Sequence, residues 1–235
     1  MMPAPMAPRR GVLSGHAVDP HENLLSEESV TPRFEFRVFG QGLRAAGDRI
    51  RELGSSEGET GSAETYFVST ATQAPPGNVK IREKTLDIKE LVESRGVLER
   101  WKPVVKTSFP LSAAMVRDTL ADALGVNFPI VNGGLYRFED LVREIILDHP
   151  QCFAAWVGKR RFRFRFRDCP VEIDEVSING AFIRSIAIES DDPEAVLDAL
   201  TEAGLQDHEN VNYPRAIRRV MGLETYAGQP WHREK

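Results

Sequence analysis

Four arginines alternate with three phenylalanines between Arg161 and Arg167, and two acids follow at Glu172 and Asp174. Successive side chains of a β-strand point to opposite faces, so this run would put its guanidiniums on one face and its phenyl rings on the other. The planar fork of arginine binds phosphate oxygens in pairs, and carboxylates are the usual ligands of Mg²⁺ and Mn²⁺. These residue types therefore indicate a site for a phosphorylated ligand.

Other segments carry the same kinds of side chains at a spacing of two. The segment 33–40 alternates charged and apolar residues, and the segment 78–84 carries further cations. If one lumen were lined by all of these cations, they would repel one another strongly unless an anion of several charges lay among them. The phosphate-binding residues expected on this argument are Arg33, Arg37, Lys80, Arg82, Arg163 and Arg165. Glu35, Glu172, Asp174 and Glu189 also sit on strands, and carboxylates of this kind are ligands for Mg²⁺ or Mn²⁺.

The elements that must position these residues are mostly strands. Period-two alternation and turn residues predict about eight strands, which cover the segments 33–40, 65–70, 78–84, 86–94, 98–109, 161–167, 171–176 and 182–190. Asn179-Gly180 predicts a hairpin, and Pro75-Pro76-Gly77 predicts a turn. Composition predicts a loop over 55–64.

Helices are expected between and after these strands. Apolar spacing and terminating glycines predict helices over 43–53, 111–124, 136–147 and from Asp192-Pro193 to Gly204. A flat sheet with its charged face in water is the simplest and in general the most common explanation of such alternation. The density of arginine and lysine favours instead an α+β fold, a mainly antiparallel eight-stranded β-barrel with flanking helices and a polar lumen.

Composition limits the function. The chain has 235 residues, 41% of them apolar, and a formal charge of −5, so it can bury a sizeable core and does not have the basic excess of a general nucleic-acid coat. No apolar segment suits a signal peptide or a membrane span. We expect a cytoplasmic protein with a disordered arm at 1–30, one barrel domain at 31–225 and a flexible tail at 226–235. The oligomeric state stays open.

The order of several motifs resembles the CYTH superfamily, also called triphosphate tunnel metalloenzymes. The segment 33–37 stands where that family has a Glu-x-Glu-x-Lys strand. The segments 65–69 and 78–83 are similar to its aromatic strand and its basic strand, and 171–190 to its late acidic strands. The resemblance spans roughly Arg33 to Ala216. It implies a barrel-shaped tunnel, a divalent metal (Mg²⁺ or Mn²⁺) held by Glu35, Asp174 and Glu189, and a triphosphate or nucleotide as ligand.

Two departures from the family pattern concern acids that the family's motifs carry. Arg33 replaces the first acid of the opening motif, and Ala187 replaces one acid of a later Glu-x-Glu pair. Losing two carboxylates weakens a metal site and favours binding over turnover, because a fixed guanidinium does not activate a water. Three interpretations stay open: a metal-dependent triphosphate hydrolase or cyclase, a catalytically inactive relative that binds an anionic metabolite, and an RNA- or protein-interaction module that uses the Arg/Phe strand as an exposed edge.

Overall fold

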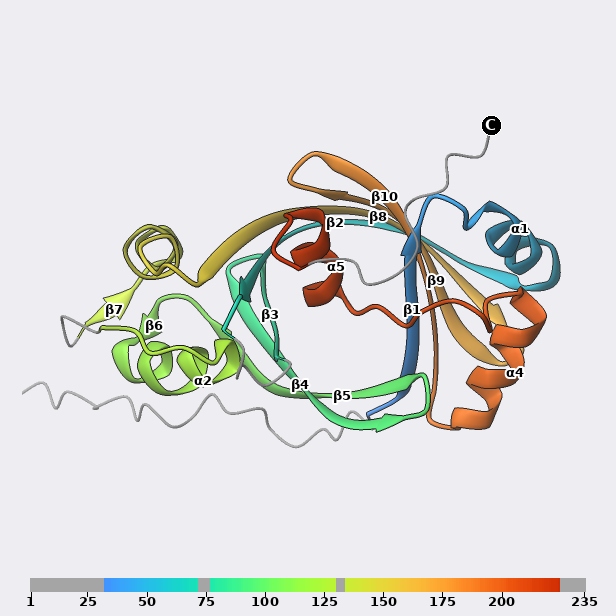
Figure 1. Cartoon of the computed structure of the whole chain (residues 1–235), viewed down its shortest axis with the longest axis horizontal. Coiled ribbons are helices and arrows are strands. Elements are labelled where there is room, and N and C mark those ends of the chain that lie inside the picture. The colour runs from blue at the N-terminus through green and yellow to red at the C-terminus, as the bar shows by residue number, and fades with distance from the viewer. Residues whose placement is uncertain (1–31, 72–76, 130–133, 225–235) are drawn as a thin grey trace, which may run out of the picture.

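Eight strands close into an antiparallel barrel in the computed structural model, which describes residues 32–71, 77–129 and 134–224 (Figure 1). The order around the barrel is β1-β10-β9-β8-β2-β3-β4-β5. The strands are β1 (Phe34–Gly40), β2 (Ser55–Ser69), β3 (Gly77–Arg82), β4 (Thr85–Arg95), β5 (Leu98–Ser108), β8 (Cys152–Phe166), β9 (Cys169–Ile178) and β10 (Ala181–Ser190). The α+β barrel expected from the sequence is confirmed.

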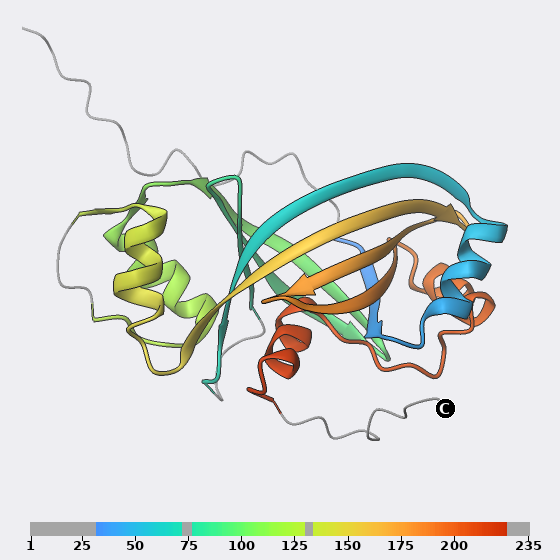
Figure 2. The same cartoon turned by 90° about the horizontal axis from the view of Figure 1, so that it is seen from above.

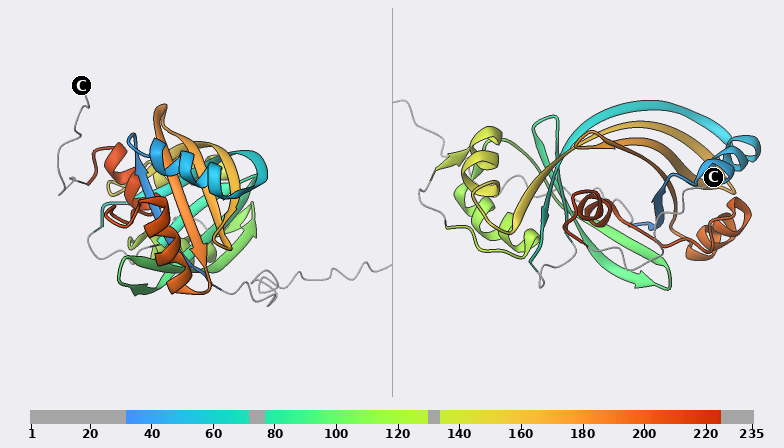
Figure 3. Two further views of the ribbon diagram at one scale, coloured as in Figure 1. Left: turned by 90° about the vertical axis from the view of Figure 1, so that its right-hand side faces the viewer. Right: turned by 45° about the horizontal axis from the view of Figure 1, so that its top comes forward.

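The helices lie outside the barrel wall or at its opening. They are α1 (Arg44–Leu53), α2 (Ala121–Leu124), α3 (Phe138–Leu141), α4 (Pro193–Ala203) and α5 (Tyr213–Val220), with two π-helical segments, η1 (Met115–Leu120) and η2 (Val142–Ile146). Figure 3 shows α1 and α4 together at one end of the molecule, while α2 and α3 form a lobe at the other with the short strands β6 (Leu111–Ser112) and β7 (Leu135–Tyr136). In Figure 1, α5 stands at the barrel opening.

Apolar residues on the outer faces of the strands pack against these helices. Phe36, Phe164 and Phe166 are buried in one cluster with residues of α1 and α4, and Phe162 packs against it. A second cluster joins β3, β4 and β5 to the lobe of η1, α2 and η2. The phenylalanines of the Arg/Phe run therefore point outward under helices, as the alternation predicts.

Local signals at the element ends agree with the sequence. Gly54 follows α1 and its N–H bonds to Ile50 O at 2.9 Å. The Asp192 side chain caps α4 by accepting from the N–H of Glu194, and α4 ends at Gly204, which has a φ of +74°. Asn179 and Gly180 both have positive φ, which the tight turn between β9 and β10 requires.

One local prediction is wrong: residues 55–64 are not a loop but the first part of β2. They pair with β8 from Arg165 to Val157, and the two long strands arch together over the barrel in Figure 2. Cross-strand pairing outweighs the small polar composition here, because β8 offers a continuous row of backbone partners. Gly58 takes a φ of +109° at an irregularity in this pairing.

The predicted helices at 111–124 and 136–147 are shorter in the structure. Leu111 and Ser112 pair with Leu135 and Tyr136 as strands, so helical backbone begins only after these residues. The predicted arm at 1–30, the tail at 226–235 and the first two residues of the Pro75-Pro76-Gly77 turn lie outside the described residues. Among the described residues, no helix combines the length and the apolar character needed to cross a membrane.

Candidate functional site

The inner face of the barrel carries the charged residues. On β1, β9 and β10 the outer face is buried against α1 and α4, so the residues between those positions point into the lumen. Strand register places these inward residues in rows across the wall, for example Arg37 beside Ala187 and Ala187 beside Glu172. The inward charged residues of the described barrel include Glu35, Arg37, Glu64, Lys80, Arg82, Asp87, Lys89, Glu99, Lys159, Arg161, Glu172, Asp174 and Glu189.

Arg37 is the centre of a buried ion-pair network. Its Nε lies 2.7 Å from Glu35 Oε1, its Nη2 lies 3.1 Å from Glu172 Oε2, and its Nη1 lies 3.3 Å from Asp174 Oδ2. To reach β9 from β1 the guanidinium must cross β10, and the residue it crosses is Ala187. A small side chain at position 187 therefore leaves the space that this network needs.

Glu35 and Arg37 in this network hold each other ionised. Burial by itself would raise the pKa of Glu35, but the Arg37 guanidinium outweighs it and the pKa lies below its usual value. Burial would likewise lower the pKa of Arg37, and the neighbouring carboxylates, Glu35 first, raise it instead. Glu35 and Arg37 are therefore both charged at neutral pH.

Asp174 is fully buried and has partners at both oxygens. Arg161 Nε donates to Oδ1 at 3.1 Å, and the Tyr213 hydroxyl donates to Oδ2 at 3.0 Å, the oxygen that also contacts Arg37. Arg161 Nη1 also lies 3.1 Å from Glu172 Oε1. The two guanidiniums and two carboxylates compensate one another on the wall of β1, β8 and β9.

Lys159 forms a second buried cluster on β8 and β2. Its Nζ donates to Glu64 Oε2 at 2.7 Å and to the Tyr66 hydroxyl at 2.8 Å, and it lies 3.7 Å from the centre of the Tyr213 ring. Burial lowers the pKa of Lys159 to about 7 despite the Glu64 carboxylate. Although burial opposes it, the charges of Lys159 and Lys80 lower the pKa of Glu64 to about 2.

On the wall of β3 and β4 the cations lie farther from carboxylates. Lys80 Nζ lies 3.6 Å from Asp87 and 4.0 Å from Glu64, and Arg82 Nη1 lies 4.0 Å from Glu64. Lys89 forms no ion pair with any described residue, although it is near enough to lower the pKa of Glu35. Burial lowers the pKa of Lys80. Cations without close partners therefore gather on this wall.

One end of the lumen is filled by apolar residues. Tyr213 and Ile217 of α5 pack against inward residues of β2, β8 and β9, and the Tyr213 ring stacks on Tyr66 with centroids 5.4 Å apart. Asn212 caps α5 by accepting from the N–H of Arg215. Helix α5 thus closes this end and fixes the floor of the charged part of the lumen.

A solved structure shares this architecture. The putative adenylyl cyclase HpAC1 from Hippeastrum, a protein with a dominant triphosphatase activity, superposes with a TM-score of 0.51 at 13% identity, over 80% of this chain and 96% of that one. At this identity the likeness shows a shared fold.

Two further solved structures reach lower scores. PH1012 from Pyrococcus horikoshii OT3 has a TM-score of 0.42 at 15% identity and covers 76% of this chain and 94% of its own. A putative adenylate cyclase from Bacillus halodurans has a TM-score of 0.41 at 17% identity and covers 80% and 97%. No family model matches the sequence, and no curated protein matches it.

The barrel brings together only some of the residues singled out from the sequence. Arg37, Lys80 and Arg82 line the lumen with Glu35 and Asp174. The other four, Arg33, Glu189, Arg163 and Arg165, form no ion pair with any of these five. Arg33 pairs with Glu189 at 3.0 Å with about half of its side chain exposed, Arg165 pairs with Glu57 at 3.0 Å, and Arg163 is exposed without an ion pair to any described residue.

The carboxylates expected from the sequence to bind a metal are already paired with arginine. Glu35 and Asp174 contact Arg37, and Glu189 contacts Arg33. Within the described ranges no three His, Cys, Asp or Glu side chains are grouped to hold a metal ion. A divalent cation would have to displace guanidiniums, so these side chains, as arranged, do not fit one.

Several lumen residues of the barrel were missed from the candidate set. Arg161 begins the Arg/Phe run, and its parity with Arg163 could have identified it. Glu64 and Lys159 had no such signal, because Glu64 lies in the segment predicted as a loop and Lys159 precedes the alternating run. The argument from repulsion also needs correction, since carboxylates on neighbouring strands compensate much of the positive charge.

Proposed function

We propose that this CYTH-type barrel binds a small phosphorylated polyanion, such as a triphosphate or a nucleotide, on the wall formed by β3 and β4. The observation that carries the proposal is the uneven pairing of the lumen cations. Arg37 and Arg161 each contact carboxylates at 3.3 Å or less, whereas Lys80 and Arg82 have none closer than 3.6 Å and Lys89 has no ion pair among the described residues.

The chemistry of this wall suits phosphate oxygens. Arg82 presents a planar fork with its side chain 47% exposed, and Lys80 adds a compact charge deeper in the lumen. An anion at this wall would gain charge-assisted hydrogen bonds without displacing a short ion pair. Burial is the main cause of the lowered pKa of Lys80, and repulsion by Lys89 and Arg82 adds to it. A bound anion would relieve this repulsion.

The arrangement supports binding more than turnover. Each carboxylate in the expected metal set contacts a guanidinium, so none is available as it stands to hold a metal that would activate water. The Mg²⁺ or Mn²⁺ that the family resemblance implies remains a prediction. Hydrolysis and cyclisation are separate outcomes of the test below.

The edge-strand interpretation is wrong. β8 pairs with β2 on one side and β9 on the other, so its backbone offers no free edge. Phe164 and Phe166 are buried under helices and cannot stack on bases. The Arg/Phe run is therefore part of the barrel wall and not an exposed interaction strand.

A thermal-shift series tests the proposal. With inorganic triphosphate in EDTA, the melting temperature should rise, because a ligand at 100 times its dissociation constant adds about 2.7 kcal/mol. Arg82→Gln with Lys89→Gln should reduce the shift to about half or less, whereas Lys102→Gln with Arg117→Gln, two exposed residues outside the lumen, should keep it. No shift in the wild type would contradict the proposal.

A parallel incubation with Mg²⁺ or Mn²⁺ decides between binding and turnover. Triphosphate, ATP and thiamine triphosphate should be recovered intact at enzyme concentrations that release phosphate in a control with an active phosphohydrolase. The contrary outcome is that the wild type releases phosphate only when metal is present and that Asp174→Asn loses this activity. That outcome would show that the carboxylates exchange their guanidinium partners for a metal, and the proposal of binding without turnover would be wrong.

A further inference from the structure

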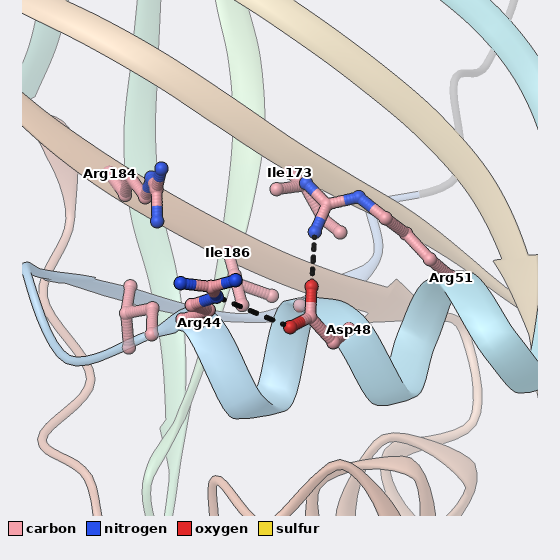
Figure 4. Close-up of a pocket in the computed structure, with 8 residues that line it drawn as sticks. Arg44, Asp48, Arg51, Ile173, Arg184 and Ile186 are labelled. Atoms are coloured by element: carbon pink, nitrogen blue, oxygen red, sulfur yellow. Dashed lines mark hydrogen bonds and ion pairs between the residues drawn. The ribbon is translucent and has the colours of Figure 1, made fainter.

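A second basic pocket lies on the outside of the barrel, between α1 and the outer face of β9 and β10. It has a volume of about 360 Å³ and is lined by Leu43, Arg44, Gly47, Asp48, Arg51, Ile173, Arg184 and Ile186. Figure 4 shows Arg44 and Arg51 on α1 and Arg184 on β10 around this space. Three guanidiniums therefore border one pocket that shares no residue with the charged lumen.

The charges in this pocket are not balanced. Asp48 is its single carboxylate, and it lies 3.1 Å from Arg51 Nη1 and 3.6 Å from Arg44 Nε. Arg184 forms no ion pair within the described part of the chain, because Glu175, opposite it on β9, pairs with Arg160 at 3.6 Å. Three positive charges and one negative charge leave a net charge of about +2.

The floor of the pocket is apolar and close to the guanidiniums. Ile173 and Ile186 are buried, with exposed fractions of 4% and 1%, and Leu43 lies beside them. Gly47 keeps the space open, since a Cβ atom there would lie 3.3 Å from Arg51 Nη1 and 3.9 Å from Ile173 Cδ1. A glycine inside a helix costs about 1 kcal/mol relative to alanine, and here it leaves room for the Arg51 head group.

We propose that this pocket is a second anion site, which binds a soluble phosphate monoester with a small apolar or planar group. A phosphate monoester carries about −1.5 to −2 charge at neutral pH, which matches the net charge of the pocket. Its oxygens would accept from Arg51 and Arg184 on opposite sides, and its organic group would lie on Ile173 and Ile186. The volume is at the lower end of small-molecule sites, which suits a ligand of this size.

The site backs directly onto the charged lumen. Ile173 lies between Glu172 and Asp174 on β9, and Ile186 lies between Ser185 and Ala187 on β10. The same two strands therefore carry the outer pocket on one face and the Arg37 network on the other. The two sites nevertheless use different cations, so each can be removed without the other.

Titration with phenyl phosphate, followed by NMR of the arginine Nε–Hε groups, tests the proposal. Saturable shifts are expected in the wild type. Arg51→Gln with Arg184→Gln should weaken binding at least tenfold. The charge-matched control Arg117→Gln with Arg143→Gln, exposed residues of η1 and η2, should bind as the wild type does. Unsaturable shifts, or equal weakening in the control, would overturn the proposal.

Two further arms distinguish this pocket from the lumen and from a membrane-binding surface. The lumen variant Arg82→Gln with Lys89→Gln should retain phenyl phosphate binding, and loss of binding there would assign the ligand to the lumen instead. Vesicles containing phosphatidic acid should not sediment the protein. Sedimentation that depends on Arg51 and Arg184, without binding of phenyl phosphate, would replace the soluble ligand with a lipid headgroup and overturn the proposal as stated.

Discussion

Arg37 Nη1 lies 3.3 Å from Asp174 Oδ2, and the two side chains are 8% and 0% exposed although they come from strands that are not neighbours in the barrel. Strand β10 separates them, and the guanidinium passes Ala187, which lies opposite Arg37, and contacts Ser185 Oγ, which lies opposite Asp174, at 3.3 Å. The position where the sequence lacks an expected acid is therefore the position that lets a cation reach the next strand. With alanine at position 187 in place of the expected acid, the Arg37 side chain has room to form an ion pair with β9.

Replacing Arg37 with methionine should destabilise the protein by about 3–5 kcal/mol, because Glu35, Glu172 and Asp174 would lose a buried cation. Urea denaturation measures this change. Arg33→Met is the matched control and should cost about 0–1 kcal/mol, since its pair with Glu189 is half exposed. Equal costs for the two variants would contradict the role given to the Arg37 network.

Ala187→Leu should destabilise the protein by about 1–3 kcal/mol, because the larger side chain overpacks a buried site. The total loss should be larger than this, because the leucine would also keep Arg37 from reaching its partners on β9. Ala187→Ser should be much milder. The sharper measurement is a double-mutant cycle with Arg37→Met. The leucine should cost less in the Arg37→Met background than in the wild type. Additive costs would show that Ala187 and Arg37 are independent.

The depressed pKa of Lys159 gives a pH dependence with a defined sign. Its pKa in the folded protein is about 7, against an ordinary value of 10.5, because the ammonium is buried. Below pH 7 both folded and unfolded chains carry the proton, so the full penalty of burying it is present. Between pH 7 and pH 10.5 the unfolded chain binds more protons than the folded chain does. The free energy of unfolding therefore rises by up to about 1.4 kcal/mol per pH unit in this range.

Denaturation of the wild type and Lys159→Met at pH values from about 7 to 9 tests this sign. The free energy of unfolding of the wild type, minus that of the variant, should increase with pH. Arg160→Met, at the neighbouring outward and exposed position, is the control and should give no such slope. A difference that is flat or falls with pH would show that Lys159 keeps its proton when folded.

Proton uptake should accompany ligand binding in the lumen. A polyanion near Lys80 and Lys159 would raise the lowered pKa values of both lysines, so the complex should take up protons near pH 8. Calorimetry in two buffers of different ionisation enthalpy measures this uptake, which should be smaller in Lys159→Met. Identical enthalpies in both buffers would mean that the ligand does not sense these lysines.

The fold was predictable because its signals are local. Period-two alternation located most strands, and Gly54, Gly204 and Asn179-Gly180 marked where elements end or turn. The segment 55–64 was not predictable, because its strand character comes from the distant partner β8 and not from its own composition. Local propensity carries no information on such pairing.

The site was predictable only in part, for a related reason. Alternation shows which residues share a face, and it placed Arg37, Lys80 and Arg82 correctly on the inner one. It does not show which charges meet across strands, and this depends on register, as between Arg37 and Glu172. The balance between paired and unpaired cations, on which the proposed function rests, therefore required the structure.

Calorimetric titration of triphosphate in EDTA tests the central claim most directly. The wild type should bind, with an affinity that falls as salt rises, and Arg82→Gln with Lys89→Gln should bind at least tenfold more weakly while keeping the wild-type circular dichroism spectrum. The variant Lys102→Gln with Arg117→Gln should match the wild type. Absence of binding in the wild type, or equal affinity in the lumen variant, would contradict a polyanion site on the wall of β3 and β4.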